Sequence, residues 1–185
     1  IVLVPGGLST FEHARDEKVL AWLRRTHESS RWTTSVCSGS VLLAAAGLLR
    51  GRRATSHWMA LPMLRPFGVH PVGDRRIVAD GRIVTAAGVS AGIDLGLWLS
   101  GRIAGDAAAQ AVQLVIEYDP QPPYDAGHVS KASVATRAAA TALLTRQTAA
   151  QRQLTAPVTL LWRAAVERVR SGGARRARPV STGSR

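Results

Sequence analysis

The sequence predicts one α/β domain built on a mainly parallel β-sheet, and three observations support this. Residues 1–4 are a continuous apolar and β-branched run that ends at Pro5-Gly6-Gly7, as a strand buried on both faces does before a tight turn. Strand-like and helix-like segments then alternate along the chain, which is typical of parallel sheets. The length of 185 residues suffices for one well-buried core but not for two ordinary domains.

The first half of the chain supplies strands and helices in alternation. Residues 12–25 carry apolar side chains at helical spacing among charged ones, which predicts an amphipathic helix on one face of the sheet. Residues 32–36, rich in Thr and Val, predict the next strand, and the almost wholly apolar residues 39–49 predict the next helix. Residues 53–55 resume an extended path that should join the parallel sheet and end near His57.

The second half adds a hairpin and further helices. Asp80-Gly81 separates two strand-like segments, 75–79 and 82–86. This dipeptide favours a two-residue turn, because a type I′ turn needs positive φ at both central positions. Helical patterns cover residues 91–103, 107–118, roughly 132–153 and 158–169.

The charge distribution indicates where the domain ends. The formal net charge is +12, and arginines crowd the C-terminal end. We assign residues 1–170 to the domain and residues 171–185 to a basic, disordered tail, because a segment of Gly, Ser and Arg cannot offset its ordering entropy. Four of the 24 basic residues lie in this tail, and we interpret the crowded arginines as a solvated segment, so we do not expect nucleic acid as a partner.

Apolar runs and cysteine content narrow the class of protein further. No apolar run approaches the roughly 18 residues of a membrane span, so we expect a soluble protein with no membrane partner. The chain opens with neither Met nor a signal peptide, and we expect a fragment that begins inside a strand. Cys37 is the only cysteine, which excludes an intramolecular disulfide and a multi-thiolate zinc site and favours the reducing cytoplasm.

Cys37 is the candidate nucleophile. It lies between a predicted strand and a predicted helix, and small residues, Ser35 and Gly39, stand two places before and after it. This pattern matches a nucleophile elbow, a sharp strand-to-helix turn in which bulky neighbours would collide with each other or with the sheet. The helix N-terminus should favour the thiolate, so we expect Cys37 to have a lowered pKa.

Further residues are candidates for supporting roles. His57 should end its strand at the same edge as Cys37 and act there as acid, base or orienting group, although a structural histidine is the alternative. The backbone amides of Gly7 and Ser38 could together form an oxyanion hole, or the glycines could simply make a tight turn. Asp94 is a possible third member of a triad, but its place in a helical first turn is explained by charge–dipole attraction.

Several of these segments resemble the ThiJ/PfpI (DJ-one) superfamily, which is class I glutamine amidotransferase-like. The stretch Gln113 to Gly127 narrows the resemblance to the isonitrile hydratase branch, and the resemblance covers the chain from Ile1 to about Ser133. The segments that carry it are Pro5-Gly6-Gly7, the elbow around Cys37, residues 46–58 and residues 85–94.

The resemblance implies a flavodoxin-like three-layer sandwich and a homodimer without a cofactor or metal. It implies a small-molecule substrate: the cysteine attacks the isonitrile carbon, and water then releases an N-substituted formamide. Two features depart from the family pattern. The first is that Ser38 stands where Thr is common. The second is that the family's first strand and helix, with its catalytic acid, would precede Ile1.

Two other functions are compatible with the same residues. Regulators of the AraC type carry a similar ligand-sensing domain before a helix-turn-helix region. About 50 residues follow the resembling segment, roughly half of what such a DNA-binding region needs, and they show no paired-helix signature. Glyoxalase-like, chaperone or oxidative-stress activity is the other alternative, because a fold does not fix a function.

Overall fold

The computed structural model of the protein describes residues 1–150, 158–162 and 164–166. Its centre is a four-stranded sheet with the strand order β1-β2-β6-β5. These strands are β1 (Val2–Val4), β2 (Thr33–Val36), β5 (Ile77–Asp80) and β6 (Ile83–Ala86). The pairs β1–β2 and β2–β6 are parallel, whereas β5 is antiparallel to β6. The predicted mainly parallel sheet with one inserted hairpin is confirmed.

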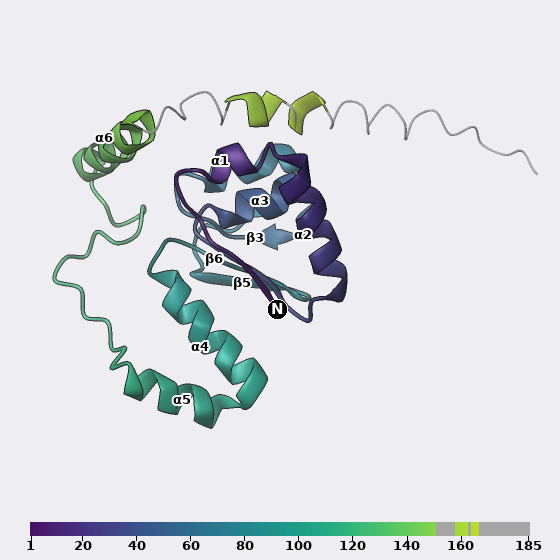
Figure 1. The fold of residues 1–185 in the computed structure, drawn as a ribbon. Coiled ribbons are helices and arrows are strands. Elements are labelled where there is room, and N and C mark those ends of the chain that lie inside the picture. Colours follow the sequence, from purple (N-terminus) through teal and green to yellow (C-terminus); the bar gives the residue numbers. More distant parts are fainter. Residues whose placement is uncertain (151–157, 163, 167–185) are drawn as a thin grey trace, which may run out of the picture.

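Helices lie on both faces of this sheet (Figure 1). One face is covered by α1 (Thr10–His13), α2 (Glu17–Ser29) and α3 (Gly39–Ala45). The other face is covered by α4 (Ala91–Ala104), which packs on β2, β5 and β6. Each face has its own core: Leu23 and Leu43 are buried in one, and Val84 and Leu95 in the other. The expected three-layer α/β sandwich is therefore confirmed.

The parallel strands bring three turns to one edge of the sheet. β1 runs into the turn before α1, β2 into α3, and β6 into α4. Because ligands of such sheets bind at the carboxyl ends of the strands, this edge is where a site is expected. Gly6 and Gly7, Cys37 and Gly88 follow these three strand ends.

A second, two-stranded sheet lies beside the first. It consists of β3 (Arg53–Ala54) and β4 (His70–Pro71), which pair in parallel, with the 3₁₀-helix η1 (Leu61–Phe67) between them in the chain. The prediction that residues 53–55 join the main sheet was wrong. The Arg53 N–H donates to the Asp80 carboxylate at 2.9 Å, so a side chain rather than a strand partner holds β3 to the hairpin.

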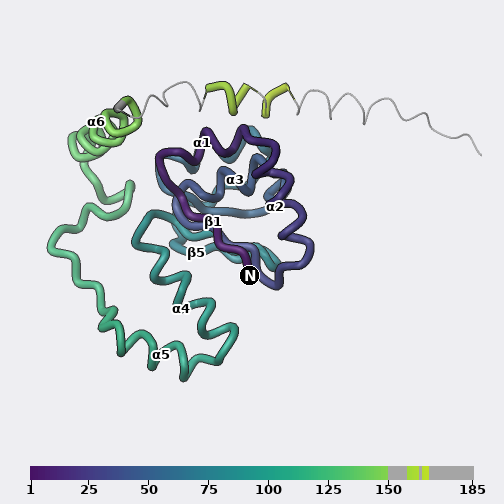
Figure 2. Tube along the Cα trace, viewed as in Figure 1, coloured from purple at the N-terminus to yellow at the C-terminus, as the bar shows by residue number. Residues whose placement is uncertain are grey.

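The remaining helices also follow the sequence pattern. They are α5 (Asp106–Val115), packed on α4, and α6 (Val134–Ala150), with an extended segment between them (Figure 2). Residues 158–162 and 164–166 are helical, and Leu160 is buried in the core with α2 and α3. The predicted tail, residues 171–185, lies outside the described residues. Within the described part of the chain, the helices are too short or too polar to cross a membrane.

Three details differ from the expectations. The helix predicted over residues 12–25 is two helices, because Asp16 caps α2 by accepting the Lys18 N–H at 2.8 Å. The helix predicted over residues 39–49 ends at Ala45 and gives way to turns. β1 is buried on one face only: Leu3 is 50% exposed, because β1 is the edge strand and α4 packs on the other three strands.

Candidate functional site

Cys37 occupies a strained turn between β2 and α3. Its φ is 60°, in the left-handed region, which costs a non-glycine residue about 1–3 kcal/mol and persists only where neighbours enforce it. Its N–H donates to the carbonyls of Ala86 at 3.1 Å and Ala87 at 2.7 Å. Its carbonyl accepts the hydroxyls of Ser56 at 3.0 Å and Ser40 at 3.4 Å. Both ends of this residue are thus fixed by hydrogen bonds.

The elbow packs so closely that its neighbours have to be small. A Cβ added to Gly39 would lie 2.2 Å from the Val4 carbonyl oxygen. A Cβ added to Gly6 would lie 2.6 Å from the Ser38 nitrogen and 2.8 Å from the Cys37 Cβ. Real Cβ atoms do not approach other atoms this closely, so the steric reason for expecting small residues at the elbow agrees with the structure.

The environment of Cys37 does not lower its pKa as expected. Burial is the largest influence and raises the pKa of the thiol above its ordinary value. The N–H and the hydroxyl of Ser38 oppose this by hydrogen bonding to the sulfur, which favours the thiolate. The prediction from the helix N-terminus was wrong in sign, because it could not include the loss of solvent around a partly buried side chain.

Gly7 and Ser38 are in direct contact and share a hydrogen-bond network. The Gly7 N–H donates to the hydroxyl oxygens of Thr10 at 2.9 Å and Ser38 at 3.2 Å. The two hydroxyl oxygens are 3.0 Å apart. The Ser38 amide hydrogen-bonds toward the Cys37 sulfur, whereas the Gly7 amide already has partners within the protein.

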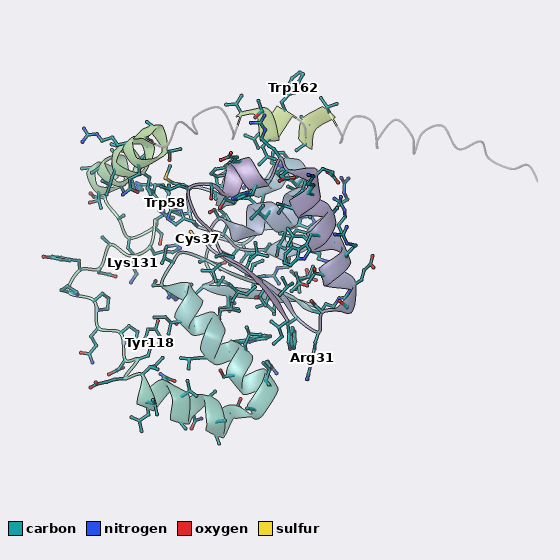
Figure 3. All side chains as sticks on the ribbon, in the orientation of Figure 1. Arg31, Cys37, Trp58, Tyr118, Lys131 and Trp162 are labelled. Carbon is teal, nitrogen blue, oxygen red and sulfur yellow. The ribbon has the colours of Figure 1, made fainter. Side chains whose placement is uncertain are left out.

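His57 lies on the same side of the molecule as Cys37. The preceding residue, Ser56, binds the Cys37 carbonyl, and the His57 Cδ2 lies 3.7 Å from the position of a Cβ added to Gly88. Figure 3 labels Cys37 and Trp58, the residue after His57. The His57 Nδ1 accepts the Met59 N–H at 3.3 Å, so the neutral ring carries its proton on Nε2. Burial lowers the pKa of His57, which favours the neutral ring.

Asp94 belongs to an ion-paired cluster at the start of α4. Its carboxylate accepts the Tyr118 hydroxyl at 2.7 Å and pairs with the Arg76 guanidinium, which also reaches the Ser90 hydroxyl at 3.3 Å. The hydrogen bond to Asp94 is the main reason why the pKa of Tyr118 is raised. The sequence indicated Asp94 but neither of its partners. Among the described residues, no group of three or more His, Cys, Asp or Glu could hold a metal ion.

The sequence indicated no role for two residues at the site, Thr10 and Ser56. Ser56 lies within the resembling segment 46–58 and Thr10 lies in none, and only the folded chain brings both to the elbow. A cavity of about 280 Å³ lies elsewhere, between α2, the end of α3 and the buried Leu160. The candidate site is thus the turn around Cys37, with Thr10 and Ser38 on one side and Ser56 and His57 on the other.

Comparisons with known proteins agree with this geometry. Residues 1–100 match the model of the DJ-1/PfpI family. The chain is 45% identical to an isonitrile hydratase of Pseudomonas putida over 127 residues, which are 69% of this chain and 55% of the relative. It is 37% identical to the HTH-type transcriptional regulator CdhR of Pseudomonas aeruginosa over 95 residues, 51% of this chain and 28% of the regulator.

Solved structures give the same result. A ThiJ/PfpI family protein from Pseudomonas syringae superimposes with a TM-score of 0.75 at 35% identity, over 87% of this chain and 65% of that one. A DJ-1 superfamily protein from Salmonella typhimurium superimposes with a TM-score of 0.56 at 29% identity, over 64% of each chain. The chain spans about half the length of the isonitrile hydratase that it matches. From the elbow, the sandwich and these matches together, the chain belongs to the DJ-1/PfpI family.

Proposed function

We propose that the whole protein hydrates isonitriles to N-substituted formamides, with Cys37 as the nucleophile. The observation that carries this proposal is the strained elbow at Cys37 in a chain 45% identical to an isonitrile hydratase. The homodimer and the absence of a cofactor that the resemblance implies belong to the same proposal, as does the cytoplasmic location that the single cysteine favours.

The proposed reaction forms and breaks one carbon–sulfur bond. The Cys37 sulfur attacks the terminal carbon of the isonitrile, and that carbon takes up a proton, which gives a thioimidate. Water then adds to the same carbon while the nitrogen takes up a proton. The new hydroxyl group gives up its proton, which balances the one that the carbon took up, while the carbon–sulfur bond breaks, the thiolate leaves and the formamide is released. The sum is the isonitrile plus one water.

The residues around Cys37 have separate roles in this proposal. The Ser38 hydroxyl and amide stabilise the thiolate before attack and after release. The Ser38 and Gly7 amides stabilise negative charge on the atoms bonded to the sulfur. Gly7 can do so only if its N–H exchanges a hydroxyl partner for the substrate. Neutral His57 is the candidate base for water, and we propose that a further part of the whole protein supplies the acid.

The test is formamide release from a simple alkyl isonitrile. We expect turnover by the full-length protein, loss of turnover in its Cys37→Ala variant, and little or none by the 185-residue chain alone. Ser35→Ala is the matched control, because Ser35 is a buried neighbour of Cys37 whose hydroxyl has no hydrogen-bond partner among the described residues. Full activity in the Cys37→Ala variant would contradict the mechanism.

A ligand-sensing domain is the second candidate function. The supporting observation is the 37% identity to a transcriptional regulator over 95 residues. On this hypothesis the full-length protein binds small molecules at the elbow but releases no formamide. Turnover that depends on Cys37 excludes it, whereas binding without turnover favours it.

A further inference from the structure

A buried pair of hydroxyl groups lies beside the candidate nucleophile. Thr10 is the first residue of α1 and Ser38 directly precedes α3, yet their side-chain oxygens are 3.0 Å apart. Thr10 is 3% exposed and Ser38 is 8% exposed. Because buried hydroxyl groups are nearly always hydrogen-bonded, the direction of each proton in this pair is decided by its neighbours.

Counting donors and acceptors leaves two directions for the proton between the two hydroxyl groups, since either oxygen could donate it. The Gly7 N–H is only a donor, so both hydroxyl oxygens act as its acceptors. Each hydroxyl has one proton, and only one proton can lie between the two oxygens. If Ser38 supplied it, the thiolate would lose its hydroxyl donor. If Thr10 supplies it, the Ser38 proton is left for the Cys37 sulfur or for the Gly7 carbonyl at the long distance of 3.4 Å.

We propose that Thr10 is a positioning residue for Cys37: its hydroxyl donates to Ser38 and thereby directs the Ser38 hydroxyl to the Cys37 sulfur. Thr10 and Ser38, the first two members of this proposed chain of donors, are 28 residues apart in sequence. The inference rests on Cys37 being the reactive centre of the proposed function. It does not depend on which substrate Cys37 attacks.

Titratable groups on the surrounding elements do not take the place of the Ser38 hydroxyl at the Cys37 sulfur. His57 follows β3 and is biased to its neutral form by burial. Asp94 at the start of α4 is paired with Arg76 on the segment before β5. Glu12 lies on α1 itself. The shift in the pKa of Cys37 arises from burial and from Ser38 and not from these charges, so the direction of the Ser38 hydroxyl is the adjustable part.

The test is the rate at which a small reagent such as iodoacetamide alkylates Cys37, followed by mass spectrometry across pH. The measurement is specific because Cys37 is the only cysteine. Thr10→Val removes the hydroxyl and keeps the shape, so Ser38 can turn away and the thiolate fraction falls. Losing a hydrogen bond of this net strength should lower the alkylation rate about 2- to 10-fold near neutral pH and move the pH profile of that rate to higher pH.

Two further variants separate the proposal from a packing effect. Thr10→Ser keeps the hydroxyl and should restore the rate and the pH profile. In a Ser38→Ala background, Thr10→Val should change nothing more, because Thr10 acts through Ser38. If Thr10→Val does not fold, Thr10→Ala takes its place in the same comparisons, with folding checked by circular dichroism.

Three results would overturn the proposal. They are an unchanged profile in Thr10→Val, a failure of Thr10→Ser to restore it, and an equal loss from Thr10→Val with and without the Ser38 hydroxyl. Alkylation needs no isonitrile, so this test stands even if the protein hydrates none. Conversely, turnover that requires Cys37 but ignores Thr10 leaves the proposed function intact and rejects only this inference.

Discussion

Replacing Gly39 by alanine should destabilise the fold far more than its place in a helix suggests. Gly39 is the first residue of α3, where alanine would ordinarily gain up to about 1 kcal/mol in helix propensity. Its added Cβ would lie 2.2 Å from the Val4 carbonyl oxygen and 2.9 Å from the Pro5 carbonyl oxygen. Both are backbone atoms next to β1, so the clash cannot be relieved by turning a side chain.

The expected loss of stability in the Gly39→Ala variant follows from overpacking. Forced backbone shifts in a packed core cost about 1–3 kcal/mol, occasionally more, and this contact is extreme. We expect a loss near the upper end, about 3 kcal/mol. For a chain of this size that corresponds to a melting temperature lower by roughly 6–12 °C.

Urea and thermal denaturation followed by circular dichroism measure this directly. Gly96→Ala is the matched control, because Gly96 lies inside α4 and nothing is within 4 Å of its added Cβ. That variant should be unchanged or stabilised by up to about 1 kcal/mol. If Gly39→Ala is as stable as Gly96→Ala, the close packing between the elbow and β1 is not what the structure indicates.

Two further outcomes are expected. Because burial lowers the pKa of His57 below 6.5 in the folded state, the unfolded chain protonates first as pH falls through 6.5. Stability should therefore be full above that pH and decline below it, and His57→Gln should flatten this decline in urea titrations between pH 7 and pH 5. Ser35→Ala should leave stability unchanged or raise it, because the Ser35 hydroxyl is buried without a partner among the described residues. A loss above about 1 kcal/mol in a thermal melt would contradict this.

The sequence predicted the parts of the fold that local sterics decide. The elbow followed from small residues on either side of Cys37, and the added Cβ of Gly39 shows why no larger residue fits. The hairpin itself followed from Asp80-Gly81, but its two turn residues are Gly81 and Arg82, because Asp80 pairs with Ile83. Of the two, only Gly81 has a positive φ, 62°, so the expected type I′ turn was wrong. Both signals lie within a few residues of the feature they specify.

Features that depend on distant contacts could not be predicted in the same way. β3 has only two residues, too few to show which sheet it joins. The raised pKa of Cys37 depends on how much solvent the surrounding elements exclude. Thr10 reaches the site because α1 folds over the start of α3, and a lone threonine carries no pattern that would indicate this.

The hydrogen bonds at both ends of Cys37 restrict what can react there. Its N–H is held by two carbonyls and its carbonyl by two hydroxyls, so the peptide cannot rotate to follow an incoming group. The sulfur can move only by turning about its own side-chain bond, beside Gly6, where even one carbon would collide with the Cys37 Cβ. On the proposed function, the substrate therefore has to come to a sulfur that is held in place, because the backbone of Cys37 cannot shift toward it.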